Sequence, residues 1–302
     1  MRVRPPSGVG VAMNGPVPTS AWQRLRRRPL AVACLVIVAL YAGVALYGEA
    51  VYRWHQARDL TPAYQAQDLS RQFQPPGRGH WLGTDGLGRD VGQRLVQGTR
   101  VAFQVGIVTS LIAIPLGVLL GLLAGYFRGR VDDVIVWLYS TFASIPGLLF
   151  ILAIAMVVGK GLTGVFLGIG LTTWVGICRL IRAEVMKHRE RTYVQAARVL
   201  GFSHARIMFR HILPNVFHVI IVTFTLRFPA SIGTEVFMSF LGLGVQGEPS
   251  WGIMINNARA RLWQGVWWEM TFTTLAVLVL VLAFNLLGDA LRDELDPRLR
   301  SR

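Results

Sequence analysis

The sequence predicts an all-α protein that crosses a membrane several times. Of its 302 residues, 53% are hydrophobic and only 16% are charged. Six apolar runs are long enough to cross a hydrocarbon core of about 30 Å, which takes about 20 helical residues. Most of the arginine and lysine residues lie between these runs rather than inside them. Together these observations indicate a polytopic membrane protein with six transmembrane helices.

The first 100 residues divide into a tail, a helix and a loop. Residues 1–20 are rich in Pro, Gly, Val and Ser without periodicity, so we expect a disordered tail. Residues 21–100 contain the first expected span, at 30–47, and then a polar loop. The arginine cluster before this span also fits a cleaved signal peptide. No small-x-small cleavage site follows, so an uncleaved anchor is the favoured interpretation.

The rest of the chain is expected to form a five-helix core. This core occupies residues 101–291, and a short charged tail, 292–302, follows it. The expected spans follow the apolar runs at 101–127, 134–158, 162–181, 216–243 and 272–291.

Charge indicates how the spans are oriented. Six spans place both termini on one side of the membrane. The segments on that side carry 20 Lys and Arg residues, against 10 on the opposite side, with Arg227 left out because it lies within a span. The positive-inside rule therefore predicts that both termini are cytoplasmic. The net charge of +15 is thereby explained by membrane edges that face anionic lipid headgroups, rather than by nucleic acid.

The sequence predicts no catalytic residues, no cofactor and no metal site in this chain. It has no G-x-x-x-x-G-K-[ST] phosphate loop, so nucleotide chemistry would belong to another subunit. The six histidines are scattered without ligand spacing, and Cys34 and Cys178 both lie inside apolar runs. No paired acid or nucleophile-base arrangement stands out at membrane depth.

The only long charged segment between apolar spans, residues 179–215, predicts two short helices. Gly201 is suited to end the first helix as a left-handed cap, and Ser203 to begin the second as its N-cap. Pro214 is expected to break or kink the second helix. Four residues of the first helix follow an i, i+3, i+4, i+7 pattern and so share one face: Tyr193, Ala196, Ala197 and Leu200.

This frame resembles the EAA loop of ABC-importer permeases, here at residues 184–214. In that family the loop docks a coupling helix onto a cytoplasmic ATPase. Gln195 stands where the family most often has Glu, and His211 where it often has Ile. From charge alone, a basic amphipathic loop lying on anionic lipid is the alternative. The resemblance implies that ATPase coupling involves Tyr193, Gln195, Ala196, Ala197, Arg198, Gly201, Phe202, His204, Leu213 and Pro214.

Three further segments are similar to one permease subunit of dipeptide, oligopeptide and nickel importers. The first of them precedes the second span and reads His80-Trp-Leu-Gly-Thr-Asp-Gly-Leu-Gly-Arg-Asp90. Where relatives usually have a Pro-rich linker after Gln246, this chain has Gly247-Glu248. The other two segments are Ser239-Phe-Leu-Gly-Leu-Gly-Val-Gln246 with Pro249-Ser-Trp-Gly252, and Asn285-Leu-Leu-Gly-Asp-Ala-Leu-Arg-Asp293 with Leu295-Asp-Pro297.

The resemblance covers residue 21 to the end and implies a type I ABC-importer permease fold in a bacterial plasma membrane. It implies four kinds of partner: a second homologous permease, two cytoplasmic ATPases, an extracytoplasmic solute-binding protein and membrane lipid. The solute would be a di- or oligopeptide, with nickel or another small solute as the alternative. A stand-alone proton-coupled secondary transporter is the rival class, and it predicts inverted repeats and acidic relays, of which only Glu235 is a sign.

Two ionisable residues inside the fifth span are candidates for the translocation path. Arg227 and Glu235 lie eight positions apart, too far to pair with each other on one helix. Charged side chains inside spans are costly, so each needs a partner helix or a function. For Glu235 the resemblance implies a structural hydrogen-bonding role near the outer end.

Glycine and proline patterns predict how the helices pack and bend. Gly117, Gly121 and Gly125 form a small-residue stripe that lets another helix approach closely, and packing within this chain is favoured over a dimer seam. Three prolines interrupt expected spans and are sites where helices kink: Pro115, Pro146 and Pro229.

Overall fold

The computed structural model describes residues 28–295, and the expected tail at 1–20 and most of that at 292–302 lie outside this range. The described residues contain no strand, and a single isolated bridge pairs Thr84 with Asp90. The helices are α2 (Pro29–Ala57), α3 (Val91–Phe127), α4 (Gly129–Ser144), α5 (Gly147–Val158), α6 (Leu162–Arg189), α7 (Thr192–Val199), α8 (His204–Arg206), α9 (Leu213–Phe240), α10 (Trp251–Arg259) and α11 (Trp268–Leu295).

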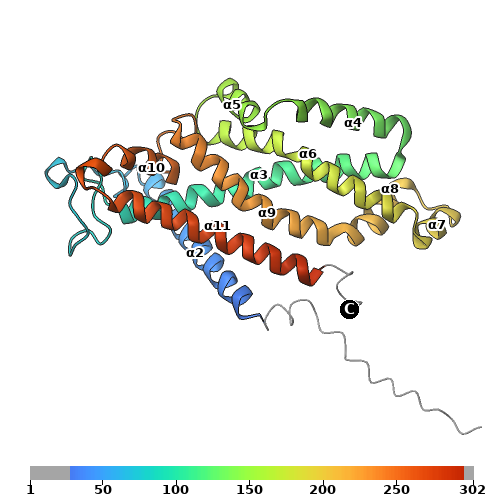
Figure 1. Cartoon of the computed structure of the whole chain (residues 1–302), viewed down its shortest axis with the longest axis horizontal. Coiled ribbons are helices and arrows are strands. Elements are labelled where there is room, and N and C mark those ends of the chain that lie inside the picture. The colour runs from blue at the N-terminus through green and yellow to red at the C-terminus, as the bar shows by residue number, and fades with distance from the viewer. Residues whose placement is uncertain (1–27, 296–302) are drawn as a thin grey trace, which may run out of the picture.

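Five long apolar helices form the body of the fold. They are α2, α3, α6, α11 and a continuous 37-residue helix, His204–Phe240, that joins α8 to α9. All run between the same two ends of the molecule (Figure 1). At one end lie the long loop after α2 and helix α10, and at the other lie α7 and α8. Each of the five is long and apolar enough to cross a membrane.

The sixth expected span is a bent pair of helices. α4 and α5 together are long and apolar enough to cross a membrane, but they meet at an angle of 89°. Pro146 lies at the break and explains it. Proline cannot donate a helical hydrogen bond, and its ring clashes with the preceding turn of a helix. The other two prolines, Pro115 and Pro229, lie inside continuous helices.

Polar residues at the start of α3 were wrongly assigned to the loop. α2 extends to Ala57 and α3 begins at Val91, so the loop between them is shorter than predicted and the expected boundary at residue 100 falls inside α3. Arg94, Gln97 and Arg100 are helical and buried. Their side chains bond to neighbouring elements, which is why their polarity does not mark a loop here.

The loop before α3 is pinned to the start of α11. Thr84 Oγ1 donates to the Arg71 carbonyl at 2.5 Å and accepts from the Gln74 backbone N–H at 2.8 Å. The indole of Trp268 donates to the Thr84 carbonyl at 3.0 Å. Asp90 then caps α3 by accepting from the Gln93 backbone N–H at 2.8 Å. The segment 80–90 is therefore a folded turn that joins two membrane helices.

The glycine stripe of α3 packs against α6 within the chain, as predicted. A Cβ built at Gly117 would lie 2.8 Å from the Trp174 carbonyl oxygen. The equivalent distances are 2.8 Å from Gly121 to the Cys178 oxygen and 2.8 Å from Gly125 to the Arg182 oxygen. The two backbones thus approach more closely than any side chain permits.

We expect Gly121→Ala to destabilise the protein by about 1–3 kcal/mol, since the new methyl group forces α3 and α6 apart. The thermal unfolding midpoint of the purified protein in detergent measures this. Gly43→Ala is the matched control, because a Cβ at Gly43 in α2 meets nothing within 4 Å. An equal effect of both substitutions would contradict the close helix contact.

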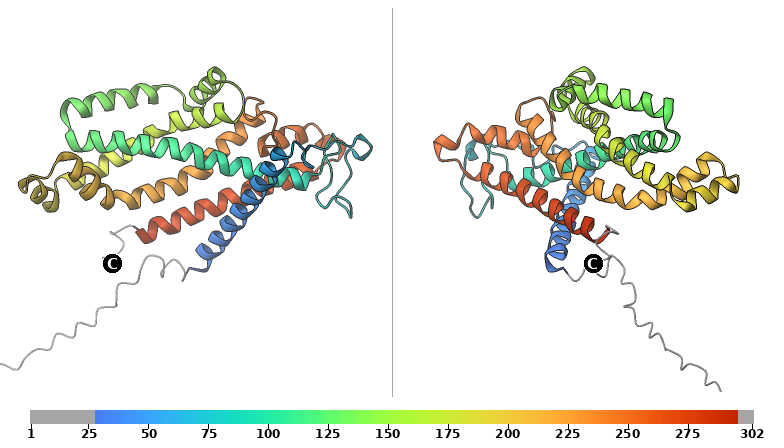
Figure 2. Two further views of the ribbon diagram at one scale, coloured as in Figure 1. Left: turned by 180° about the vertical axis from the view of Figure 1, so that it is seen from behind. Right: turned by 45° about the vertical axis from the view of Figure 1, so that its right-hand side comes forward.

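The two described ends of the chain meet at one end of the helix bundle. Arg28, just before α2, pairs with Asp293 at 3.1 Å and with Glu294 at 3.1 Å, both near the end of α11. α2 and α11 lie side by side in all three views (Figures 1 and 2). The start of α2 and the end of α11 therefore lie next to each other at one end of the bundle.

Candidate functional site

Helix α7 ends as the sequence predicted. Gly201 has a φ of +73°, in the left-handed region where glycine is favoured. The Phe202 N–H donates to the Ala197 carbonyl at 3.1 Å, and the Gly201 N–H donates to the Arg198 carbonyl at 3.0 Å. This pair of hydrogen bonds is a Schellman motif, which satisfies the last carbonyls of α7 and turns the chain sharply.

The helix after this turn also begins as predicted but does not break at Pro214. Ser203 Oγ accepts from the Arg206 backbone N–H at 3.3 Å and caps α8. The helix then widens to a π-helical stretch, Ile207–Ile212, and continues into α9. Pro214 falls in the first turn of α9, directly after the π-helical stretch, where its missing N–H costs least. The predicted break is wrong for that reason.

The predicted apolar face of α7 is divided between the interior and the surface. Val194 and Ala197 are buried against Ile207 and Ile212 in one hydrophobic cluster. Ala196 is exposed and Leu200 is 70% exposed. A face drawn through all four predicted residues is therefore wrong, because the chain's own helices cover the Val194 side of α7.

Aromatic and histidine side chains fasten the charged segment to the long helices. The Tyr193 hydroxyl and His188 Nδ1 lie 2.8 Å apart and share a hydrogen bond, as do the Tyr126 hydroxyl and His204 Nδ1 at 2.8 Å. Burial raises the pKa of Tyr193 above its usual value, so its hydroxyl keeps its proton for this bond. These contacts join α7 to α6 and α8 to α3.

The turn between α7 and α9 is closed by stacked side chains. The rings of Phe202 and His211 are stacked, with centroids 5.5 Å apart. The Arg206 guanidinium also lies over the Phe202 ring, 4.6 Å from its centroid. His211 thus packs on an aromatic ring.

The outer surface of this segment carries exposed apolar side chains, which we call the apolar tip: Val199, Leu200 and Phe209. They are 89%, 70% and 50% exposed. The same segment also carries exposed basic residues, among them Arg191. Exposed apolar groups of this kind are typical of a surface that a partner covers. Sequence reasoning missed Val199 and Phe209, because periodicity alone does not show which face the chain itself buries.

The ten residues predicted for coupling all lie on this one segment, but they differ in exposure. Ala197 is buried, whereas Gln195, Ala196, Gly201, His204 and Pro214 are exposed. The rest are half-buried: Tyr193, Arg198, Phe202 and Leu213. Gln195 also donates to the Arg189 carbonyl at 3.4 Å, so its amide bonds to this chain.

The two candidate residues of the fifth span lie in different surroundings. Glu235 is 1% exposed and accepts from Ser239 Oγ at 2.6 Å, and Ser239 Oγ accepts from the Val245 N–H at 3.0 Å. It holds the C-terminal end of α9 to the loop that follows. Arg227 is only half-buried and lies next to Gly176 of α6.

We expect Glu235→Ala to destabilise the protein by about 1–3 kcal/mol, since it leaves the buried Ser239 hydroxyl without its acceptor. Glu235→Gln retains an acceptor oxygen and should lose less than half as much. The midpoint of thermal unfolding in detergent measures both. Equal losses in the two variants would show that the carboxylate charge, rather than the hydrogen bond, is what the fold requires.

Comparison with known proteins identifies the class. A family model described as "Binding-protein-dependent transport system inner membrane component" matches residues 117–301. A second, described as "N-terminal TM domain of oligopeptide transport permease C", matches residues 19–76. The chain therefore belongs to the family of inner-membrane components of binding-protein-dependent transport systems.

The curated relatives are permease subunits. The chain is 37% identical to the dipeptide transport system permease protein DppC of Bacillus subtilis, over 93% of this chain and 85% of the relative. It is 38% identical to the glutathione transport system permease protein GsiD of Pectobacterium atrosepticum, over 93% and 91%. It is 33% identical to the oligopeptide transport system permease protein OppC of B. subtilis, over 93% and 89%.

Solved structures confirm the type of fold. The chain is similar to the MetNI methionine ABC transporter with a TM-score of 0.50 and 17% identity, over 66% of this chain and 94% of that one. It is similar to an amino acid ABC transporter with a TM-score of 0.52 and 16% identity, over 68% and 95%. The all-α, multi-pass permease fold predicted from the sequence is thus confirmed.

Proposed function

We propose that this chain is the permease subunit of an ATP-driven, binding-protein-dependent importer of di- or oligopeptides. It forms half of the translocation path, and a second homologous permease forms the other half. The observation that carries the proposal is the similarity, over 93% of the chain, to permeases named for dipeptide, glutathione and oligopeptide transport.

The apolar tip is the proposed contact with a cytoplasmic ATPase, and the whole importer contains two such ATPases and an extracytoplasmic solute-binding protein. Helix α7, which leads to Leu200, and helix α8 lie at one end of the molecule (Figure 2). Its exposed apolar groups suit a socket on a protein better than a lipid surface, because the Schellman turn and the stacked Phe202 hold them in one fixed arrangement. The continuous helix His204–Phe240 then transmits movement of the tip to the membrane.

The proposed location is the bacterial plasma membrane, with both termini in the cytoplasm. Two observations support this orientation. The Arg28 ion pairs bring the start of α2 and the end of α11 together. The end of the bundle that carries α7 and α8 is also the more basic one, as the positive-inside rule requires of a cytoplasmic face.

In this proposal the chain itself performs no covalent chemistry, and the separate ATPase subunits hydrolyse ATP. The support is compositional, since the sequence lacks a phosphate loop. Its own contribution is to hold the path and to pass on the movement of the ATPases. The basic ends of the bundle bind anionic lipid headgroups, and nucleic acid has no part in the function.

A cysteine crosslink tests the contact between tip and ATPase. Leu200→Cys in the assembled importer should crosslink to a cysteine on the ATPase, whereas Ala197→Cys, which is 3% exposed, should not. The two native cysteines, Cys34 and Cys178, are buried and will not compete. No crosslink from Leu200→Cys in an intact complex would contradict the proposed docking.

Uptake by reconstituted vesicles tests the type of transport. Peptide uptake should require ATP on the cytoplasmic side, the ATPases and the solute-binding protein. Uptake that continues without ATP, driven by a proton gradient, would favour a stand-alone secondary transporter. ATP-dependent uptake of nickel with no uptake of peptide would show that the chain belongs to an ATP-driven importer whose solute is nickel.

A further inference from the structure

Arg227 lies at the middle of α9, within the 37-residue apolar helix His204–Phe240. It is 14 residues from the start of α9 and 13 from its end, which is about 20 Å along the helix axis in each direction. Gly176, beside it, is likewise at the middle of α6. A guanidinium at this depth is costly unless an anion or water accompanies it.

Arg227 is not paired within the part of the chain that the structure describes. It forms no hydrogen bond or ion pair there, and no charged group of residues 28–295 lies close enough to act on it. Arg100, also in a long helix, shows the contrast, because it pairs with Glu49 at 2.7 Å and with Glu248 at 2.6 Å. The fold supplies carboxylates to that arginine and leaves Arg227 free.

The neighbouring helix leaves room for the guanidinium. A Cβ built at Gly176 would overlap Arg227 Nη2. Gly176 is exposed and lies in the interior of α6, where glycine usually destabilises a helix. The space that it leaves for the Arg227 side chain explains why a glycine suits this position. The missing side chain at position 176 lets the guanidinium lie across α6.

Small and polar residues continue from Arg227 along the same side of α9. Thr223, one turn before it, is buried and its hydroxyl has no hydrogen-bond partner among the described residues. Ala230 and Thr234, at i+3 and i+7, are exposed and half-buried respectively. Ala230 and Thr234 are small, so this stripe places no bulky side chain next to the half-buried guanidinium.

We propose that Arg227 binds a carboxylate of the solute as it crosses the membrane, so that the importer selects solutes with a free carboxylate. This inference rests on the proposed function. Guanidinium and carboxylate match in a two-point, charge-assisted geometry, and a peptide with a free C-terminus carries such a group. A bare divalent metal ion would instead be repelled.

The test uses the complete importer in vesicles with ATP and two peptides that differ in one group. One tripeptide ends in a free carboxylate and the other in an amide, and the solute-binding protein is saturated with each, as calorimetry verifies. Arg227→Gln should lower the uptake rate of the carboxylate peptide by about tenfold or more, because a charge-assisted hydrogen bond is lost. Uptake of the amide should change less than about twofold.

Three further variants separate a specific role from a structural one. Gly176→Ala keeps the arginine but displaces its guanidinium, so it should lower carboxylate uptake in the same direction as Arg227→Gln. Gly43→Ala, in open space on α2, should change neither rate. Arg227→Lys keeps the charge without the two-point geometry and should recover part of the uptake.

Three results would overturn the inference. Equal loss for both peptides in an assembled importer would show that Arg227 pairs with a carboxylate of the second permease. No loss for either peptide would show that the guanidinium is solvated by water or lipid. Equal dependence of both peptides on Gly176 would show a packing role. If the unsubstituted importer takes up neither peptide while hydrolysing ATP, the proposed peptide function itself fails, whatever Arg227 does.

Discussion

Leu200→Asp is expected to abolish coupling to the ATPases while leaving the permease folded. Leu200 is 70% exposed and makes no essential contact within the chain, so the fold tolerates the change. In the complex the carboxylate would be buried without a partner, which costs more than the roughly 1.4 kcal/mol that corresponds to a tenfold loss of affinity. ATP hydrolysis stimulated by the loaded binding protein, and co-purification of the ATPase, measure the effect.

Thr192→Asp is the matched control for this prediction. Thr192 is an exposed residue in the first turn of the same helix, where a carboxylate favours the helix dipole. It introduces the same charge away from the apolar tip. Normal ATPase stimulation in Leu200→Asp, or an equal loss of stimulation in Thr192→Asp, would show that the apolar tip is not the contact surface.

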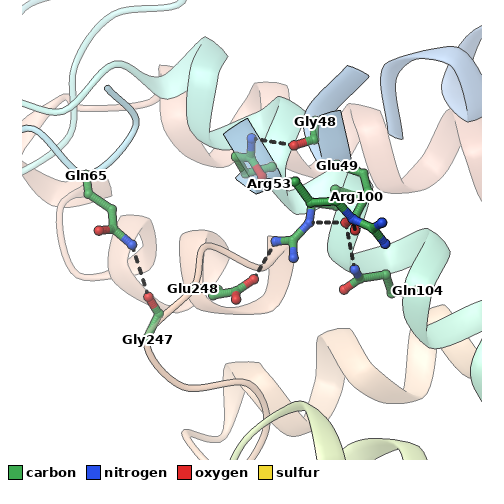
Figure 3. Close-up of polar contacts among 9 residues, drawn as sticks. Gly48, Glu49, Arg53, Gln65, Arg100, Gln104, Gly247 and Glu248 are labelled. Carbon is green, nitrogen blue, oxygen red and sulfur yellow. Dashed lines mark hydrogen bonds and ion pairs between the residues drawn. The ribbon is translucent and has the colours of Figure 1, made fainter. Parts of the chain in front are cut away.

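Arg100→Met is expected to destabilise the protein by about 2–3 kcal/mol, somewhat below the value for a fully buried pair because the two carboxylates are partly exposed. Arg100 is 4% exposed and joins three elements. It bonds to Glu49 of α2 and to Glu248 of the loop after α9 (Figure 3). Its guanidinium also lies 3.6 Å from the ring centroid of Tyr52 in α2. The substitution removes the cation of Glu248 and leaves Glu49 with only the exposed Arg53 as its partner.

Arg53→Met provides the control for Arg100→Met. Arg53 pairs with the same Glu49 at 2.6 Å, but its side chain is 76% exposed, so its loss should have almost no effect on the unfolding midpoint. Adding Glu49→Gln and Glu248→Gln to Arg100→Met should recover part of the stability. If Arg53→Met and Arg100→Met have equal effects, the buried ion pairs do not hold these elements together.

The sequence alone was sufficient to predict the apolar spans and the helix caps of the charged segment. Long apolar runs mark α2, α6, α9 and α11, because a helix that faces lipid must be apolar along its length. Gly201 and Ser203 behave as predicted because their roles depend only on local backbone chemistry.

The start of α3 required information from distant residues. Arg94, Gln97 and Arg100 are polar, and only their partners elsewhere in the chain make them helical and buried. Glu248, which replaces the usual Pro-rich linker, is one of those partners. The sequence showed the departure at this position but not the guanidinium that it meets.

The sequence predicted which segment carries the candidate site but not which of its side chains face the interior. Every predicted coupling residue lies on the charged segment, but Val194 rather than Ala196 faces the interior. The π-helical stretch explains part of the difficulty, since it shifts the helical period after Arg206 and local sequence does not mark it. The docking contact itself remains a prediction.

The pairing of the first and last helices has a consequence for biosynthesis. α2 packs on α3, which the ribosome makes soon afterwards, and on α11, which it makes last. At roughly 5–20 residues per second, α2 waits on the order of 10–50 s for α11 to emerge. During that interval Arg28 has not yet met Asp293 and Glu294. A nascent chain halted before α11 would therefore expose one side of α2 to quality-control proteases of the membrane.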